Sequence, residues 1–244
     1  DASLKLSYQT PVGTLSSVSA LSTSREIVTG DAYDFLPINQ SFFHGLFGFD
    51  LNQSQFLNAQ YLSEELRLTS PTDQRFRWIG GVYVLGTQRF ISTGNMVDTG
   101  QGVFGVYKAP TTNPLNPQAT FLSDTQHNLA WAGYFDTSTS LTDQIELSAN
   151  FRYDSDHRRN VTDTPTAFLP TTTAFTGQVR EHTWDAFQPQ VILRYKPQAD
   201  LNLYVSYSRG FRSGGFNQTG VGAVAAQNGF LNVGDLCPAE TADT

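Results

Sequence analysis

The sequence predicts an all-β chain: an antiparallel, up-and-down segment of about eight strands in the wall of a transmembrane β-barrel. Three observations predict this class. Apolar and polar residues alternate along several stretches, short turns alternate with long connections, and the composition is unusual. Charged residues make up 15% of the chain, against roughly 25% in soluble domains, while aromatic residues reach 13%. Such a composition suits a surface that is apolar on one face and wet on the other.

In chain order, the first ten residues, DASLKLSYQT, already show the pattern of a strand, and no signal peptide precedes it. We therefore expect a mature piece of a barrel, truncated at both ends. EELRLT, residues 64–69, alternates leucine with charged residues. In IELSANFRYD, residues 145–154, every odd position is apolar and every even position is polar. At 100° per residue those positions would scatter around a helix, whereas in a strand they form one face.

Two later stretches repeat this alternation. QVILRY, residues 190–195, does so with Ile192 as an exception, and LNLYVSY, residues 201–207, does so throughout. No apolar run approaches the ~20 residues that a membrane helix needs. A barrel wall instead requires that every backbone group pair with a neighbouring strand.

The connections between strands are of two lengths. Short turns that contain Pro, Gly or Asp lie at 10–14, 70–75, 138–144 and 196–200. Long connections are expected at roughly 27–53, 92–126 and 154–182, with another beginning near 217. Four hairpins with all their short turns at one end are typical of outer-membrane barrels, which have short periplasmic turns and long extracellular loops.

Other classes of function find little support in the residues. The net charge is −7 and no Lys/Arg cluster is present, which argues against nucleic acid as a partner. His44, His127, His157 and His182 are far apart, so we expect no catalytic residues, no metal site, no cofactor and no enzyme activity. The single Cys237 cannot form a disulfide within the chain.

The stretch LNLYVSYSRGFRSGGFN, residues 201–217, resembles a barrel strand of TonB-dependent outer-membrane receptors. In that family the strand reads Leu-x-x-Tyr-x-Ser-Tyr/Phe-Ser-x-Gly-Phe-Lys/Arg-x-Gly-Gly-Phe-Asn and rises to an outer loop. Here Tyr204, Ser206, Tyr207, Ser208, Gly210, Phe211, Arg212, Gly214, Gly215, Phe216 and Asn217 match. We expect this strand to leave the bilayer near Arg209, with Arg209 and Arg212 facing lipid headgroups or acids of the outer loops.

Three further segments agree with the resemblance. Residues 63–84 resemble the family's Glu-Leu-Arg-Leu hairpin with its Ser-Pro turn and Trp-x-x-Gly-x-Tyr strand, and residues 130–158 resemble the hairpin with Leu-Thr-Asp at its turn. Residues 238–244 resemble the stretch that leads into the next strand. The resemblance implies that residues 1–244 are one partial barrel domain, with about eight of the family's twenty-two strands. The plug domain and the TonB box would lie outside this sequence.

The resemblance also implies a function for the parent protein. It would be a receptor in the outer membrane of a Gram-negative bacterium that takes up a scarce nutrient, most often a ferric siderophore, with energy delivered through TonB at the plug. Its partners would be outer-membrane lipid, lipopolysaccharide, TonB and a nutrient ligand. Two alternatives stay open: a passive porin-like outer-membrane channel, and a soluble all-β domain that binds carbohydrate.

The polar residues that alternate with apolar ones along the strands are candidates for the barrel lumen. A mid-membrane arginine on the lipid face would cost about 2–4 kcal/mol, so such residues belong on the wet side. We expect them to pair with one another or with the plug more than with cargo. The candidates are Glu65, Arg67, Glu146, Asn150, Arg152 and Arg194.

Overall fold

The computed structural model describes residues 1–31, 40–98, 118–166, 169 and 175–216, which form one antiparallel sheet and one short helix. The elements are β1 (Ala2–Thr10), β2 (Gly13–Asp31), α1 (Phe42–Phe47), β3 (Asp50–Thr69), β4 (Phe76–Asp98), β5 (Gln118–Ser140), β6 (Ile145–Thr162), β7 (Val179–Gln198) and β8 (Leu201–Ser208). The eight strands pair in chain order, each with the next, which confirms the up-and-down arrangement.

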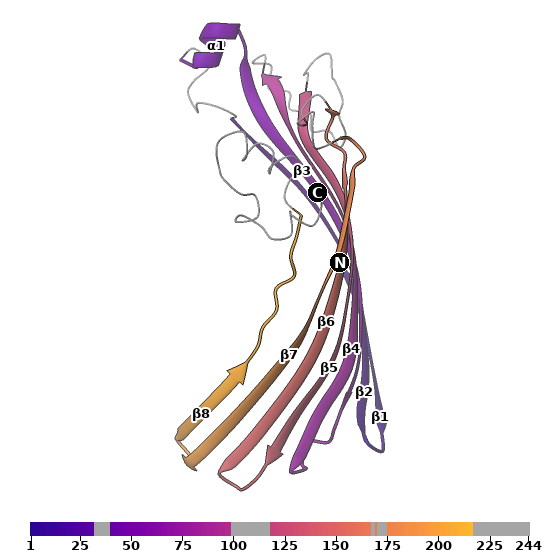
Figure 1. The fold of residues 1–244 in the computed structure, drawn as a ribbon, viewed down its shortest axis with the longest axis vertical. Coiled ribbons are helices and arrows are strands. Elements are labelled where there is room, and N and C mark those ends of the chain that lie inside the picture. The colour runs from indigo at the N-terminus through magenta and orange to yellow at the C-terminus, as the bar shows by residue number, and fades with distance from the viewer. Residues whose placement is uncertain (32–39, 99–117, 167–168, 170–174, 217–244) are drawn as a thin grey trace.

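The sheet is a single curved wall (Figure 1). Among the described residues no ladder joins β1 to β8, so the wall is open at both edges. The described strands carry no second sheet over either face, which contradicts the soluble β-sandwich alternative. No helix in the described part of the chain is long and apolar enough to span a membrane.

All four predicted short turns are confirmed. They connect β1 to β2, β3 to β4, β5 to β6 and β7 to β8 at one end of the wall. Thr10 stabilises the first turn by donating its hydroxyl to the Gly13 carbonyl at 2.7 Å. In the third, Thr142 accepts hydrogen bonds from the backbone N–H groups of Gln144 and Ile145 at 3.2 and 3.0 Å. Short polar side chains that bond to nearby backbone are typical of tight turns.

The long connections expected from the sequence are longer than those in the structure. The strands β2 to β7 have 18 to 23 residues and extend well into the segments expected to be loops. For example, β6 continues through residues 154–162 and pairs there with β7. The sequence there is polar on both faces, so it lacks the alternation that predicts a strand, but the backbone ladder does not need that alternation. Helix α1, capped by the Ser41 hydroxyl, was also not predicted.

The two faces of the wall differ sharply in chemistry. Directly paired residues share a face, so the ladders extend the alternation of each strand across the whole sheet. One face carries exposed apolar side chains, which we call the apolar belt. Its members are Leu4, Leu6, Tyr8, Leu15, Leu21, Leu62, Leu66, Val82, Val84, Leu129, Trp131, Phe135, Phe151, Tyr153, Phe187, Val191, Leu193, Tyr195, Leu201, Leu203, Val205 and Tyr207.

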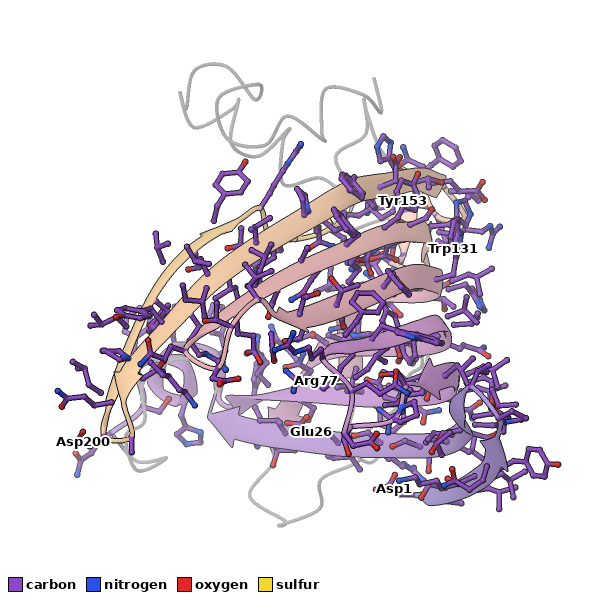
Figure 2. The ribbon with its side chains drawn as sticks, turned by 90° about the horizontal axis from the view of Figure 1, so that it is seen from below. Asp1, Glu26, Arg77, Trp131, Tyr153 and Asp200 are labelled. Atoms are coloured by element: carbon purple, nitrogen blue, oxygen red, sulfur yellow. The ribbon has the colours of Figure 1, made fainter. Side chains whose placement is uncertain are left out.

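The apolar belt has defined limits. Along β7 its outward positions run from Tyr195, near the short turn, to Phe187, after which Asp185 and Glu181 occupy the same face. Aromatic rings pair across strands within it: Trp78 with Phe135 at 5.9 Å and Trp131 with Tyr153 at 5.6 Å between centroids. Trp131 and Tyr153 lie on the opposite side of the wall from Arg77 (Figure 2).

One carboxylate interrupts the apolar belt. Glu64 lies between Leu62 and Leu66 on β3, yet it is on the apolar face. Ser17 donates its hydroxyl to one carboxylate oxygen at 2.6 Å, and Ser19 donates to the other oxygen. These two donors compensate in part for apolar surroundings that would otherwise disfavour a carboxylate.

The most buried side chains gather at the outer end of the wall, beyond the apolar belt. Phe56, Ser123, Asn160 and Thr162 are almost fully buried there. The segment after β6 continues alongside β5, where Thr164 accepts a hydrogen bond from the Ser123 N–H at 2.8 Å and donates one to the Ser123 carbonyl at 3.1 Å. This local packing holds the outer ends of the strands together above the belt.

Candidate functional site

The concave face of the wall, opposite the apolar belt, is polar and charged. Near the short turns Glu146 lies between two arginines. Arg194, its direct partner on β7, donates to one carboxylate oxygen at 2.9 Å, and Arg77 of β4 donates to the other. Arg77 also donates to Ser138 at 3.2 Å, and Ser148 lies 3.3 Å from that same hydroxyl. A single carboxylate thus connects three strands, β4, β6 and β7.

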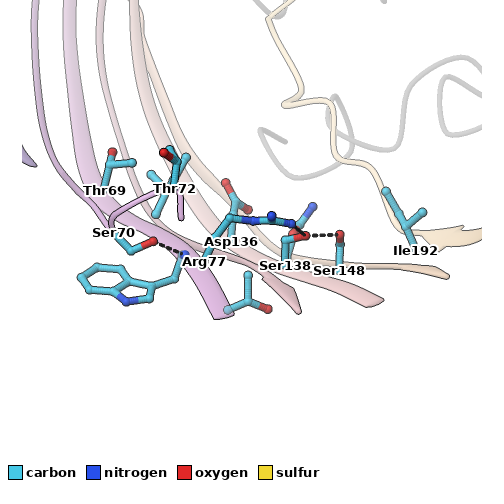
Figure 3. A pocket seen from close by; sticks show the side chains of 12 residues that line it. Thr69, Ser70, Thr72, Arg77, Asp136, Ser138, Ser148 and Ile192 are labelled. Atoms are coloured by element: carbon cyan, nitrogen blue, oxygen red, sulfur yellow. Dashed lines mark hydrogen bonds between the residues drawn. The ribbon is translucent and has the colours of Figure 1, made fainter. Parts of the chain in front are cut away.

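A pocket of about 310 Å³ lies beside this charged group (Figure 3). Arg77, Asp136, Ser138 and Ser148 line it from the concave side, and Ile192 closes its far edge. The exception in the alternation of QVILRY therefore has a structural position. It places an aliphatic side chain on the concave face, where Ile79 lines the same pocket.

Higher on β3 and β5, Tyr134 reaches across two strands to Glu65. Its hydroxyl donates to Glu65 Oε1, and Arg67 lies 3.9 Å from the other oxygen of the same carboxylate. The tyrosine ring covers Gly81, where a Cβ atom would lie 2.5 Å from the phenol oxygen. The glycine in the Trp-x-x-Gly-x-Tyr pattern therefore gives the ring room to cross.

Higher still, β6 and β7 carry a second set of paired charges. Arg152 forms a two-pronged pair with Asp154, with both N–O distances 2.7 Å, and Gln188 donates to the same carboxylate. Below it, the Asn150 amide donates to Gln190 at 2.8 Å. Toward the outer end Arg158 donates twice to the largely buried Asp156, at 2.9 and 2.7 Å. Each carboxylate on this part of the wall therefore has its own guanidinium partner.

All six lumen-facing candidates lie on this concave face. Glu65 lies beside Arg67, and Glu146 pairs with Arg194. Asn150 and Arg152 instead have partners that the sequence analysis did not select, Gln190 and Asp154.

Sequence reasoning also missed Arg77 and Tyr134. Arg77 comes directly after a turn, before any alternation is visible, and the aromatic ring of Tyr134 resembles a lipid-facing residue. Counting alternate positions from Glu146 back through the turn at 138–144 could have identified Tyr134, and counting from Arg67 through the turn at 70–75 could have identified Arg77.

The family-motif residues divide between the wall and a segment that leaves it. Tyr204 and Ser206 face the concave side of β8, while Tyr207 belongs to the apolar belt. The strand ends at Ser208, and the Arg209 N–H still bonds to the Pro189 carbonyl at 3.0 Å. Residues 209–216, which we call the crossing segment, then pass over the concave face of β6 and β7 (Figure 1). Asn217 lies outside the described residues.

The crossing segment is held by close contacts. Arg158 donates to Ser213 at 2.6 Å, and the Phe216 ring lies 5.6 Å from the Trp184 ring. Gly214 lies so close to the Trp184 indole that a Cβ atom would be 2.5 Å from it. At Gly210 there is open space instead.

For Arg212 the expectation was lipid headgroups or acids of the outer loops. It lines a cavity on the concave side together with Asp154 and Asp156, two acids at the start of a segment that was expected to be a long outer loop. The path of the crossing segment over β6 and β7 brings it there. Arg209, by contrast, continues the alternation of Val205 and Tyr207, which belong to the apolar belt.

The histidines are not grouped on one face: His127 and His157 share a face of neighbouring strands, and His182 is on the opposite face. His44 is in α1, and His127, His157 and His182 lie on three different outer strand ends. In the described ranges no three His, Cys, Asp or Glu side chains are grouped to hold a metal. Burial raises the pKa of the Asp124 carboxyl, also on an outer strand end, against the opposing effect of Arg180. Cys237 lies outside the described residues.

The charged group around Glu146 makes a testable contribution to stability. In the full-length protein, Glu146→Gln should lower the free energy of unfolding by about 1–2 kcal/mol, because two guanidiniums lose one charged acceptor. The three side chains are 23–41% exposed, which limits the effect. The matched control is Glu181→Gln, whose single partner Arg159 is 40% exposed and whose loss should change stability by less than about 0.5 kcal/mol. Urea unfolding of both variants measures this, and equal losses would contradict the role of Glu146.

Comparisons with known proteins bear on this geometry. The family described as TonB dependent receptor-like, β-barrel, matches residues 2–244. No curated protein matches the chain in sequence. Among solved structures, the chain is similar to the ferric yersiniabactin uptake receptor FyuA from Yersinia pestis, with a TM-score of 0.57 and 16% identity over 84% of this chain and 26% of that one.

Two further structures are similar over the same 84% of this chain. The siderophore receptor PiuA from Acinetobacter baumannii has a TM-score of 0.54 and 16% identity, with 31% of its length covered. The copper transporter OprC has a TM-score of 0.53 and 13% identity, with 29% covered. Identities this low establish a shared fold. The chain spans 26–31% of the length of these proteins.

Proposed function

This chain belongs to the TonB-dependent receptor β-barrel family, and from that premise we propose that it forms part of the wall of an outer-membrane receptor that imports a ferric siderophore. One observation carries the proposal: a single curved sheet has an apolar belt on one face and paired charges on the other. In a bilayer this sheet would close with further strands, so that the belt meets acyl chains and the charges face a wet lumen.

The proposed partners follow from the same two faces. The apolar belt would contact outer-membrane lipid, and the polar outer ends of the strands would lie at the level of lipopolysaccharide. Cargo would pass along the concave face, and TonB would act through a plug domain of the parent receptor. Such a wall holds its shape during transport, because each strand pairs with its neighbours along most of its length.

The mechanism involves binding and gated passage, without bond chemistry. On the concave face most guanidiniums and carboxylates neutralise one another locally, as at Arg194 and Glu146 or Arg152 and Asp154. A wall with its charges paired in this way remains hydrated yet binds a passing ion only weakly. Siderophore uptake is supported by the family and by two similar structures that are siderophore receptors.

The test is iron uptake by the full-length receptor. In a strain that lacks other ferric-siderophore receptors, its expression should restore uptake of radioactive iron from at least one ferric siderophore, and a protonophore or loss of TonB should abolish that uptake. Uptake that persists without TonB would support the passive channel instead. Growth on another nutrient with no uptake of any iron chelate would overturn siderophores as the cargo.

A further inference from the structure

A cavity of about 410 Å³ lies between the crossing segment and the concave face of the wall. Arg152, Asp154, Asp156 and Gln188 line it from β6 and β7, and Phe211 and Arg212 line it from the crossing segment. Its volume is within the range of about 300–1,000 Å³ typical of small-molecule sites. The lining combines charged groups with one aromatic ring, which suits a ligand that is partly polar and partly apolar.

The charged groups that line this cavity differ in whether they have a partner. Asp154 already accepts from both prongs of Arg152 and from Gln188, and Asp156 accepts twice from Arg158. Both carboxylates of the lining are therefore paired with guanidiniums, and neither of these pairs includes Arg212. Within the described part of the chain, Arg212 has neither an ion pair nor a hydrogen bond, and its side chain is exposed.

This difference favours an anion over a cation as the ligand. A metal ion or an amine would have to displace the arginines that already satisfy Asp154 and Asp156. An anion needs no displacement, because the Arg212 guanidinium offers its donors to the cavity. Guanidinium and carboxylate match in geometry and form two parallel hydrogen bonds.

The position of Arg212 is set by its neighbours. On its C-terminal side Ser213 bonds to Arg158, and Gly214 packs on the Trp184 indole. On its N-terminal side Arg209 remains bonded to β7 through its backbone. The backbone that carries Arg212 is thus held on both sides, so binding of a ligand does not have to order this segment, which favours affinity.

We propose that Arg212 binds a carboxylate of the cargo in this cavity, and that the cargo is an anionic, carboxylate-bearing iron chelate. The inference rests on the proposed uptake function and narrows its substrate class. The Phe211 ring would contact the carbon skeleton of the same ligand.

The experiment measures binding of two probes to the purified full-length receptor: iron(III) citrate, which carries free carboxylates, and an iron(III) trihydroxamate, which lacks them. Arg212→Gln should weaken citrate-chelate binding at least tenfold and change trihydroxamate binding less than twofold. Arg212→Lys should recover part of the loss, since it keeps the charge but loses the two-pronged geometry. Arg209→Gln is the matched control in the same segment and should leave both affinities unchanged.

Heat-modifiable migration on gels establishes that all three variants are folded. If Arg212→Gln leaves citrate-chelate binding intact, or if Arg209→Gln weakens it as much, the assignment of Arg212 is overturned. A receptor that binds and imports only the trihydroxamate would overturn the carboxylate class while leaving siderophore uptake standing. A receptor that imports neither chelate and no other iron source would overturn the uptake function as well.

Discussion

Gly13→Ala is expected to reduce sharply the amount of folded receptor in the outer membrane. Gly13 has φ of +146°, a backbone conformation that L-residues rarely adopt. A Cβ atom built there would lie 2.1 Å from the Thr69 carbonyl oxygen and 2.9 Å from its carbon. Both are backbone atoms of the neighbouring strand, so no side chain can rotate away to relieve the clash.

The consequence of that clash reaches beyond the turn. Thr14 pairs directly with Thr69, so movement at Gly13 disturbs the ladder between β2 and β3 where it starts. Backbone strain of this kind costs on the order of 1–3 kcal/mol by itself, before any loss of hydrogen bonds. We therefore expect a large fall in the yield of heat-modifiable, folded barrel and a lower thermal midpoint for what remains.

Gly30→Ala is the matched control for this variant. Gly30 lies on the same strand, and a Cβ atom there meets nothing within 4 Å. The same chemical change should therefore alter stability by no more than about 0.5 kcal/mol. Comparable yields of the two alanine variants would show that the contact between Gly13 and Thr69 does not restrain the first hairpin.

The parts of the fold that were predictable are those in which a strand has one apolar and one wet face. Residues 145–154 and 201–207 alternate because their two faces meet different surroundings, so both the strand and its orientation could be predicted. Residues 155–162 do not alternate, because both faces at the outer end are polar. The sequence there resembles a loop although its backbone remains paired.

The candidate site was predictable only in part, for a related reason. Parity placed Glu146 and Arg194 on one face, but it could not show that Arg77 reaches the same carboxylate from a third strand. Likewise, the motif at 209–216 indicated glycine-rich backbone without indicating its path. That path depends on the Trp184 ring and on Arg158, contacts that no local pattern in the segment encodes.

Val205→Arg should be the most damaging single substitution on β8 in the full-length receptor. Val205 lies in the apolar belt between Leu203 and Tyr207, is 66% exposed, and pairs with Leu193 on β7. An arginine near the middle of the lipid face costs about 2–4 kcal/mol. We expect little folded receptor in the outer membrane and incomplete folding into vesicles in vitro.

Ser206→Arg adds the same side chain and charge one residue further along the strand. Because Ser206 points to the concave face opposite Ile192, its arginine would enter the wet interior and avoid the lipid cost. The ratio of folded protein between the two variants therefore measures which face meets lipid, independently of any effect of charge on synthesis or secretion. If Ser206→Arg were the more damaging, the two faces would be reversed, and the concave charges, Arg212 among them, could not face the transported ligand.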